Sequence, residues 1–512
     1  MARLTAELLR CTPLLLFPLA AGAIAQQESD SPTRDAVFVN RVTWGATSTE
    51  LARARQMGLD RYLQAQLHPE PQDNLPAEVQ QRIDALSISR QSDEDTRAIQ
   101  IDMRRKASAL PNDEKMKSNL EARQMAYRRA AEVNQRALWR AVYGGNQLQD
   151  QMTWFWMNHF NVDLQKDDVG TFLSQYEDRA IRPHALGKFR DLLAATMRSP
   201  SMLIYLDNSQ NIAGKINENY ARELMELHTM GVEGGYSQND VRELARILTG
   251  LGIGDSQDPP KIQPALQAQI VQQGYFLFNP ARHDYGSKVF LGHTISGAGM
   301  AEIEQAADLL ASHPATARFV SRKLATFFTG DAPPTSLVDR MSRTFLQKDG
   351  DISATLETLF ESPEFTASLR TGVFKDPVHY LYSSLRLAYD GFAPITNAKM
   401  GVNLLTRLGQ PLNQRRTPDG YSLSKSDWTG SAQMSTRFET ASIIASAPQV
   451  FYRENPDERP QNVPQPPNLL KANESNGLLS ALSPRTREAI AQAKSTPIAN
   501  TYLLTSPEFM HR

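Results

Sequence analysis

The sequence predicts a mainly α protein: a large multi-helix globular domain with one small β-hairpin and long C-terminal loops. Three observations lead to this fold class. Apolar residues recur at helical spacing in most stretches of the 512-residue chain. The clearest strand-like runs lie within about residues 274–296, and a long segment without periodicity covers residues 408–437. A hydrophobic content of 41% and a charged content of 22% are typical of a globular protein.

Residues 1–25 have the pattern of a cleaved export signal. Arg3 and Arg10 precede a short apolar run, and Ala23 and Ala25 supply the small residues that a signal peptidase needs. The run is too short for a membrane span, so we expect no transmembrane segment after cleavage. An uncleaved N-terminal anchor is the alternative. The mature protein is therefore expected in the periplasm or outside the cell.

After the signal, the polar residues 26–34 predict a flexible tether, and residues 35–512 predict a single large helical domain. The only cysteine, Cys11, lies within the signal, so the stability of the mature chain must come from burial rather than disulfides. The net charge of -1 provides no basic surface, and we expect no nucleic-acid partner.

The first helices follow from capping and charge patterns. Ser48, Thr49 and Glu50 predict the start of a helix that ends near Leu67. Residues 76–140 are dense in charged side chains with few apolar positions, which predicts an arm of long, exposed helices. Acids alternate with the basic residues there, which favours a solvated face over a nucleic-acid surface.

Residues 147–160 predict a helix whose end carries a candidate catalytic residue. Leu148, Met152, Phe155 and His159 share one apolar stripe, so His159 is expected to be buried. A buried histidine is more often a satisfied core donor than a ligand, but His159 can also serve as an auxiliary catalytic group.

The loop at residues 205–209 contains Asp207 and Asn208, which either face a substrate pocket or only cap a turn. Further along, residues 275–278 and 288–291 have strand character and predict a β-hairpin. The turn between them carries His283 and Asp284. These two residues are candidates for substrate binding, with bracing of the loop as the alternative.

The most informative run is 217–231, which predicts one continuous amphipathic helix. Tyr220, Leu224 and Leu227 form its packing stripe. A polar edge runs beside this stripe and consists of Asn219, Glu223 and Glu226, while Arg222 can hold Glu218 or Glu226. On a continuous helix, His228 points roughly 140° to 160° away from the two glutamates, so one metal ion could not be held by all three.

The segment at residues 408–437 is expected to be a long irregular loop, and loops of this length are usually functional or disordered. Aromatic, amide and arginine side chains there suit the rim of a cleft for a polar ligand such as a glycan. The relevant residues are Gln410, Arg415, Arg416, Asp419, Tyr421, Trp428 and Arg437, of which Gln410, Arg415 and Trp428 are our candidates for substrate binding.

Several of these motifs together resemble the bacterial domain-of-unknown-function family 1800. They are residues 154–160, 181–187, 205–208, 217–231, 283–284 and 408–411, in the order expected for the family from about residue 35 to the C-terminus. The resemblance implies an exported bacterial protein. Its members are often encoded beside another exported family, which implies an exported protein partner. The family pattern commonly has histidine at the position of Met157, so a metal site needing both that position and His159 is not expected here.

Three functions compete. The first is an exported hydrolase or lyase acting on a polar polymer, with Glu223 and Glu226 as acid and base, Arg222 and Asn219 as charge and orientation partners, and His159 or His283 as auxiliary groups. The second is a periplasmic scaffold or binding protein, in which the same charges form a structural network and the arm binds a partner. The third is a divalent metal site of Glu223, Glu226 and His159; otherwise no cofactor is predicted.

Overall fold

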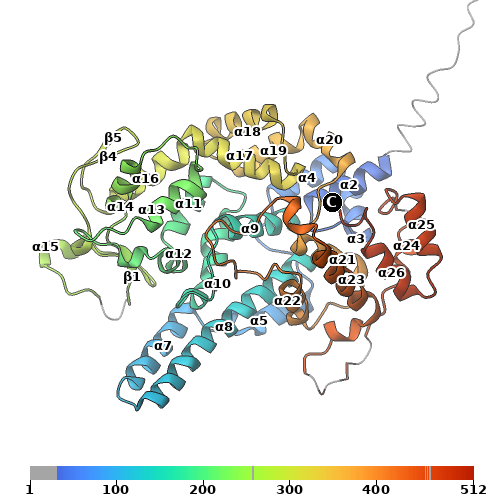
Figure 1. Cartoon of the computed structure of the whole chain (residues 1–512), viewed down its shortest axis with the longest axis horizontal. Helices are drawn as coiled ribbons and strands as arrows, with labels where there is room; N and C mark the ends of the chain where they lie inside the picture. The colour runs from blue at the N-terminus through green and yellow to red at the C-terminus, as the bar shows by residue number, and fades with distance from the viewer. Residues whose placement is uncertain (1–30, 256–258, 456, 458, 461–462, 475) are drawn as a thin grey trace, which may run out of the picture.

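The structure is a computed structural model, and it describes residues 31–512 except 256–258, 456, 458, 461–462 and 475. The protein is mainly α, as the sequence predicts (Figure 1). The predicted export signal and residues 26–30 of the predicted tether lie outside the described residues. Residues 31–34, which we expected to be flexible, form the first turn of helix α2 (Ser31–Val42).

The helix predicted for residues 48–67 is two helices. Thr47 accepts a hydrogen bond from the backbone of Glu50 and caps α3 (Ser48–Met57). Gly58 then adopts a φ of 81°, which ends α3 and starts α4 (Leu59–Leu67). Two short helices follow, α5 (Ala77–Ala85) and α6 (Ser87–Arg90).

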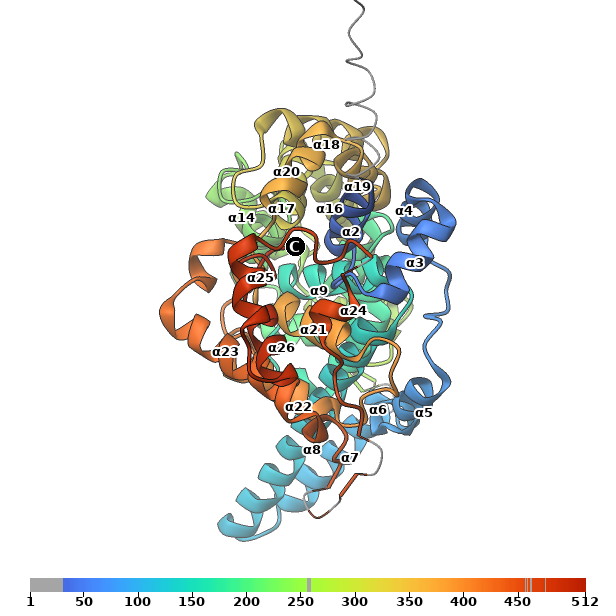
Figure 2. The ribbon, with the colours of Figure 1, turned by 90° about the vertical axis from the view of Figure 1, so that its right-hand side faces the viewer.

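The charged arm is a helical hairpin of α7 (Asp93–Ala107) and α8 (Asn112–Tyr143). Its tip projects from the body of the molecule (Figures 1 and 2). Only the first part of α8 is exposed, because its second part carries buried side chains such as Val133 and Leu138. The segment predicted as an arm therefore also supplies part of the core.

The helical series that begins with α9 lies at the centre of the molecule (Figure 1). Two of its segments, η2 and η5, are π-helices, which hydrogen-bond five residues back instead of four. The bounds are α9 (Gln147–His159), η1 (Val169–Thr171), α10 (Leu173–Gln175), η2 (Tyr176–Ile181), η3 (Arg182–His184), α11 (Phe189–Met197), α12 (Pro200–Tyr205), η4 (Asn208–Gln210), α13 (Asn219–Glu223), η5 (Leu224–Thr229) and α14 (Gln238–Ile247).

The two strand-like runs are strands, but they do not pair with each other. β3 (Phe276–Phe278) lies between β1 (Leu251–Ile253) and β2 (Val271–Gln273) in one antiparallel sheet, whereas β4 (Lys288–Phe290) pairs with β5 (His293–Ile295). The predicted hairpin is thus corrected to two small sheets. Each strand is only three residues long, too short for the sequence to specify its partner. Helix α15 (Pro264–Gln267) lies between β1 and β2 in the chain, and η6 (Pro280–Arg282) lies between β3 and β4.

The C-terminal half is again helical. The predicted irregular segment ends at residue 430, because residues 431–437 belong to α23, whose first turns show no apolar stripe in the sequence. The bounds are α16 (Met300–Ser312), α17 (Pro314–Thr329), α18 (Thr335–Gln347), α19 (Ile352–Phe360), α20 (Pro363–Thr371), α21 (Pro377–Tyr389), α22 (Ala398–Arg407), η7 (Lys425–Trp428), α23 (Ser431–Ser446), η8 (Pro448–Phe451), α24 (Leu469–Ala472), α25 (Pro484–Ala491) and α26 (Thr496–Leu504).

Two apolar cores hold these helices. The larger one unites α9, α11–α14 and α16–α20, and the smaller one unites the end of α8 with α21–α23 and α26. Trp154 on α9 packs against both cores. The end of α9, where His159 lies, therefore sits near the junction of the two halves of the molecule.

Candidate functional site

The central helix begins at Asn219 and changes its winding at Leu224, where α13 passes directly into η5. The Met230 N–H donates to the carbonyl oxygen of Met225, five residues back, at 2.9 Å. We predicted a continuous α-helix, and the wider winding corrects this. Thr229 Oγ1 donates to the Leu224 carbonyl at 2.6 Å and so satisfies it without the α-helical bond. Such π-helical turns occur frequently at functional sites.

His159 lies between η5 and α17, and it forms hydrogen bonds with the backbone of η5 and with a lysine of α17. Its Nε2 atom lies 3.0 Å from the carbonyl oxygen of His228, so Nε2 carries the proton and donates it. Nδ1 is therefore an acceptor, and Lys323 Nζ donates to it at 2.8 Å. His159 is buried, as predicted, and both of its ring nitrogens are engaged.

Burial lowers the pKa values of these three groups. Burial and the charge of Lys323 hold the pKa of His159 well below its ordinary value, and burial lowers the pKa of His228 to about 3. Both imidazoles are therefore neutral at neutral pH. Burial also lowers the pKa of Lys323 to about 8, although the charge of Asp419 opposes this shift. The amine thus releases its proton close to neutral pH.

Glu223 is half-buried, and the pKa of its carboxyl group is shifted the other way. Burial and the charge of Glu226 raise the pKa of Glu223. Arg222 opposes the rise, whereas Asp419 adds to it. Arg222 does not bond Glu226: its guanidinium donates to Glu218 at 3.1 Å, one of the two partners we considered.

Asp419 connects these two groups, because it is within electrostatic reach of both Lys323 and Glu223. It belongs to the long loop that we expected to line a cleft. The loop is fixed to the end of α9 by Asn158, whose side chain donates to the Tyr421 carbonyl at 2.9 Å and accepts from the Tyr421 N–H at 2.6 Å. The loop therefore holds a defined conformation beside His159.

Close packing adds to this attachment. Asn161 donates to the backbone carbonyl of Arg415 at 2.9 Å. Gly420 has a φ of +73°, and a Cβ atom there would lie 2.1 Å from the Asn158 carbonyl oxygen. Only glycine fits this approach. The side chain of Arg415 forms an exposed ion pair with Asp419 at 3.3 Å.

Two further predicted residues lie at the edge formed by Glu223 and the long loop, which we call the margin. Asp207 forms an ion pair with Lys166 at 2.8 Å. Asn219 donates to the backbone carbonyl that precedes Asp207, at 3.1 Å. The hydroxyl of Tyr205 donates to the Arg416 carbonyl at 2.9 Å and ties the end of α12 to the long loop. The structure thus gathers Asn219, Glu223, His159, Asp207 and Arg415 around one margin.

His283 and Asp284 lie elsewhere and brace the region of the small sheets. His283 Nδ1 lies 2.7 Å from the Thr249 carbonyl oxygen, and its Nε2 contacts the carboxylate of Glu302. Asp284 forms an ion pair with Arg246 at 2.8 Å. These contacts match the loop-bracing alternative.

Asn208, Gln410 and Trp428 also make contacts that support the fold. The amide of Asn208 donates to two backbone carbonyls beside β1, at 3.1 and 3.0 Å. Gln410 Oε1 accepts from the Val378 N–H at 3.0 Å, and the Trp428 indole donates to the Ser422 carbonyl at 3.0 Å. None of these three contacts leads to the margin of Glu223.

Sequence reasoning missed Lys323 and did not single out Asp419. Lys323 lies at the border between the buried and exposed faces of the amphipathic helix α17, and it is 164 positions away from its partner His159. No local pattern marks such a residue. Asp419 was one of several polar residues in the long loop, and only the docking of that loop on α9 distinguishes it.

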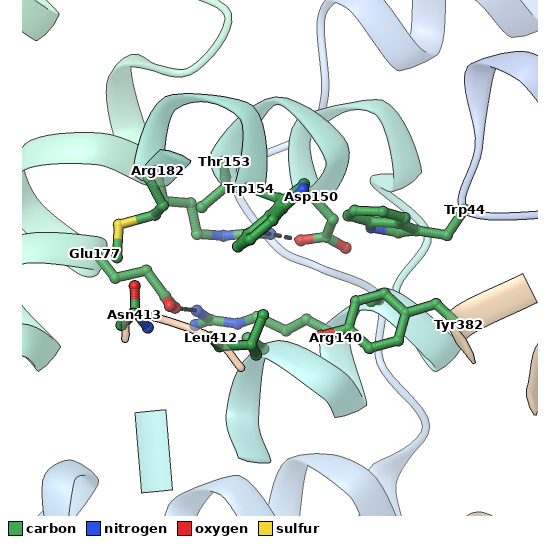
Figure 3. A pocket seen from close by; sticks show the side chains of 13 residues that line it. Trp44, Arg140, Asp150, Thr153, Trp154, Glu177, Arg182, Tyr382, Leu412 and Asn413 are labelled. Atoms are coloured by element: carbon green, nitrogen blue, oxygen red, sulfur yellow. Dashed lines mark hydrogen bonds and ion pairs between the residues drawn. The ribbon is translucent and has the colours of Figure 1, made fainter. Parts of the chain in front are cut away.

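A second set of charges lines a hollow between α8, α9 and η2 (Figure 3). Arg182 forms ion pairs with Asp150 and Asp73, and Arg140 forms one with Glu177 at 3.1 Å. The hollow encloses about 470 Å³, part of it open to solvent. Its remaining walls are mainly aromatic and apolar and include Trp44, Trp154, Met157, Tyr382 and Leu412.

Met157 and His159 lie on different sides of α9. Met157 lines the hollow beside Trp44, whereas His159 contacts Lys323 and the backbone of His228. The two positions are two residues apart on a helix, which turns their side chains in nearly opposite directions. A metal site using both positions is therefore not formed by this helix.

Across the parts of the chain that the structure describes, no three His, Cys, Asp or Glu side chains are grouped so that they could hold a metal ion. Glu223, Glu226 and His159 therefore do not form such a group. His159 cannot ligate in the observed arrangement, because Nε2 donates to a carbonyl and Nδ1 accepts from Lys323.

Comparison with known proteins decides the family. The sequence model described as "Protein of unknown function (DUF1800)" matches residues 37–511. The chain belongs to this family. This confirms the resemblance drawn from the sequence motifs. Comparisons with curated proteins and with solved structures find no match. Of the helices in the described residues of this DUF1800 protein, none combines the length and apolar character needed to cross a bilayer.

Proposed function

We propose that the protein is an exported enzyme, a hydrolase or lyase acting on a polar polymer, with its active site at the margin of Glu223, Asp419 and Lys323. The pair of opposite pKa shifts carries the proposal: the pKa of Glu223 is raised and that of Lys323 is lowered to about 8. A structural ion pair shifts both groups in the reverse directions, because each charge favours the other. Shifts of the kind found here are typical of acid–base catalysis.

The shifts assign a role to each group. A carboxylate with a raised pKa is a stronger base, and an ammonium with a lowered pKa is a stronger acid. Glu223 takes a proton from the attacking water in a hydrolysis, or from a carbon atom in an elimination. Lys323 gives its proton to the leaving oxygen. The Nδ1 atom of neutral His159 accepts from Lys323 and so positions the amine.

The neighbouring residues support these roles. Glu226 adds the negative charge that keeps the pKa of Glu223 raised. Asn219, Asp207 and the exposed Arg415 offer hydrogen-bonding and charged groups to the polymer along the margin. Because this side is formed by an exposed loop, a long chain can lie across it without threading into the core.

Glu223→Gln and Lys323→Met test the proposal. Both variants are assayed on a panel of bacterial and plant polysaccharides, with new reducing ends reporting hydrolysis and ultraviolet absorbance of unsaturated products reporting elimination. We expect each variant to lose activity by about 10²-fold or more, the usual contribution of a general acid or base. The matched controls are Glu361→Gln and Lys399→Met at exposed positions. Full activity in both test variants would contradict the proposal.

A scaffold or binding protein is the second candidate, and exposed apolar residues on the arm favour it. Ile99, Leu110, Met116, Leu120 and Tyr127 lie on α7, α8 or the turn between them, and between 38% and 68% of each is exposed. Exposed apolar residues are typical of a protein-binding surface where they gather into one patch. Met116→Glu should then reduce copurification with an exported partner protein, while Glu223→Gln leaves copurification unchanged.

Residues 1–25 bear on where in the cell the protein acts. We propose export to the periplasm or beyond, supported by the signal pattern of those residues. Mass spectrometry of the protein from a periplasmic fraction should find a mature N-terminus close to Gln26. A cytoplasmic protein that retains Met1 would contradict this.

A further inference from the structure

A separate cavity lies between α2, the end of α20, α21 and residues 507–512, away from the margin of Glu223. It has a volume of about 380 Å³ and opens to solvent, which is enough for a small organic ligand. Backbone bonds fix its floor: Val373 and Arg512 exchange two hydrogen bonds of 2.8 Å, and the Lys375 N–H donates to the Met510 carbonyl at 2.8 Å.

Lys375 projects into this cavity without a polar partner. Its side chain is only 2% exposed, and Nζ lies 3.8 Å from the centroid of the Phe509 ring. No hydrogen bond or ion pair joins Nζ to any residue that the structure describes. A cation–π contact compensates only part of the cost of burying an ammonium group.

The nearest charges make this position more positive. Arg437 and Arg512 are both buried, and burial together with these two charges holds the pKa of Lys375 well below its ordinary value. Arg437 donates to the Lys375 carbonyl at 2.7 Å, and Arg512 donates to the Gln151 side chain at 2.9 Å. No side-chain carboxylate of a described residue forms an ion pair with any of the three cations.

The acids near the cavity are already engaged. Asp376 accepts from the His379 ring, with 3.0 Å between Oδ2 and Nδ1. Glu508 lies in the cavity wall, where it accepts from the Ser483 backbone at 3.0 Å and from the Thr486 hydroxyl. Neither carboxylate forms an ion pair with Lys375, and the charge of Asp376 acts on Arg437 and Arg512 instead.

The rest of the cavity wall is largely apolar. Leucines from three parts of the chain contribute to it, together with small residues of α2, and Arg370 stands exposed at the same cavity. The leucines are Leu369, Leu387, Leu478, Leu479 and Leu482. A wall of this kind accepts an apolar body, and the cations at its floor attract an acidic group.

We propose that this cavity binds a small organic anion, a carboxylate whose apolar body lies against the leucines and whose acidic group forms an ion pair with Lys375. The ligand supplies the counter-charge that the described residues do not provide, and it leaves the wall dry around its hydrocarbon part. The site is independent of the acid–base margin, because it shares no residue with it.

Isothermal titration calorimetry with hexanoate as the probe tests this. Hexanol serves as the neutral probe of the same shape, and sodium sulfate tests a purely ionic site. We expect hexanoate to bind at millimolar concentration or tighter, at least tenfold more tightly than hexanol or sulfate. Lys375→Met should weaken hexanoate binding at least tenfold, whereas the exposed control Lys399→Met should bind like the wild type.

Three results would overturn the proposal: no binding of hexanoate, equal binding of hexanoate and hexanol, or unchanged binding by Lys375→Met. A second measurement does not depend on a variant. In the wild-type protein with ¹⁵N-labelled lysine, the Nζ resonance of Lys375 should show a raised pKa when hexanoate is added, because an ion pair favours the charged amine. An unchanged pKa at saturating hexanoate contradicts the assignment.

Discussion

The hollow beside Trp44 and the cavity of Lys375 differ in how their buried charges are balanced. In the hollow, Arg182 pairs with Asp150 and Arg140 with Glu177 (Figure 3), and Arg182 also pairs with Asp73. In the cavity, no described side-chain carboxylate forms an ion pair with Lys375, and Asp376 acts on Arg437 and Arg512 through its charge alone. Both places contain buried arginine or lysine, yet only the first has matched each cation within the fold.

This difference separates structural charges from functional ones. A matched buried ion pair stabilises its own geometry, and removing one partner leaves the other unpaired in a medium of low polarity. An unmatched buried cation has no such role and is available to a ligand. The margin of Glu223 is a third case, in which the pKa shifts run opposite to those of an ion pair.

The largest effect is expected for Arg182→Met in the hollow. This change leaves the buried carboxylate of Asp150 without its partner, whereas Asp73 keeps its ion pair with Arg140. The free energy of unfolding should fall by about 3–5 kcal/mol, measured by chemical denaturation at pH 7. The control is Arg179→Met, whose exposed pair with Glu94 at 3.6 Å should contribute less than about 1 kcal/mol. Equal losses in the two variants would show that the buried ion pairs of Arg182 contribute no more to stability than an exposed ion pair does.

The sequence alone predicts much of the fold because local patterns carry it. The stripe that ends at His159 is buried as expected, and so are Tyr220 and Leu224, whereas Leu227, the third residue of the predicted packing stripe, is only half-buried. Long-range partners are different. The contact of His159 with Lys323 depends on packing between helices, and the pairing of β3 with β1 depends on tertiary context.

The charged sites were predictable only in part. Asn219, Glu223 and Glu226 are recognisable because helical spacing places them on one edge. The π-helical winding after Leu224 has no sequence signal of its own, since it depends on a side-chain bond from Thr229 to a carbonyl. The arginines and acids of the hollow come from separate segments, so no single stretch of sequence shows that they are matched.

A pH titration of stability examines the margin. Lys323 has a pKa of about 8 in the folded protein, below its ordinary value of 10.5. The unfolded chain therefore binds more protons between these pH values, and stability rises with pH across this window. Comparison with Lys323→Met isolates the group: the wild type should gain at most about 3 kcal/mol relative to the variant from pH 8 to 10.5. Parallel curves would mean that Lys323 is not desolvated.

Gly420→Ala tests how firmly the loop holds Asp419 at that margin. The new Cβ atom would lie 2.1 Å from the Asn158 carbonyl oxygen, so the loop must shift. We expect a loss of about 2 kcal/mol in the free energy of unfolding, together with lower activity. Gly391→Ala is the matched control, since Gly391 also has a positive φ but nothing lies within 4 Å of its added Cβ. A similar loss in both variants would attribute the effect to backbone conformation alone.

The smallest effect, and the one of opposite sign, is expected for Lys375→Met. The variant removes a buried amine that has no acidic partner and retains a side chain of similar length, so the free energy of unfolding at pH 7 should rise by about 1 kcal/mol. Chemical denaturation with and without hexanoate measures this. The ligand stabilises only the wild type, so saturating hexanoate should narrow or reverse the difference in the free energy of unfolding between the variant and the wild type. A loss of stability in the variant without ligand would show that the contact with Phe509 already compensates for burial of the amine. The buried charges of the cavity would then be compensated within the fold, as those of the hollow are.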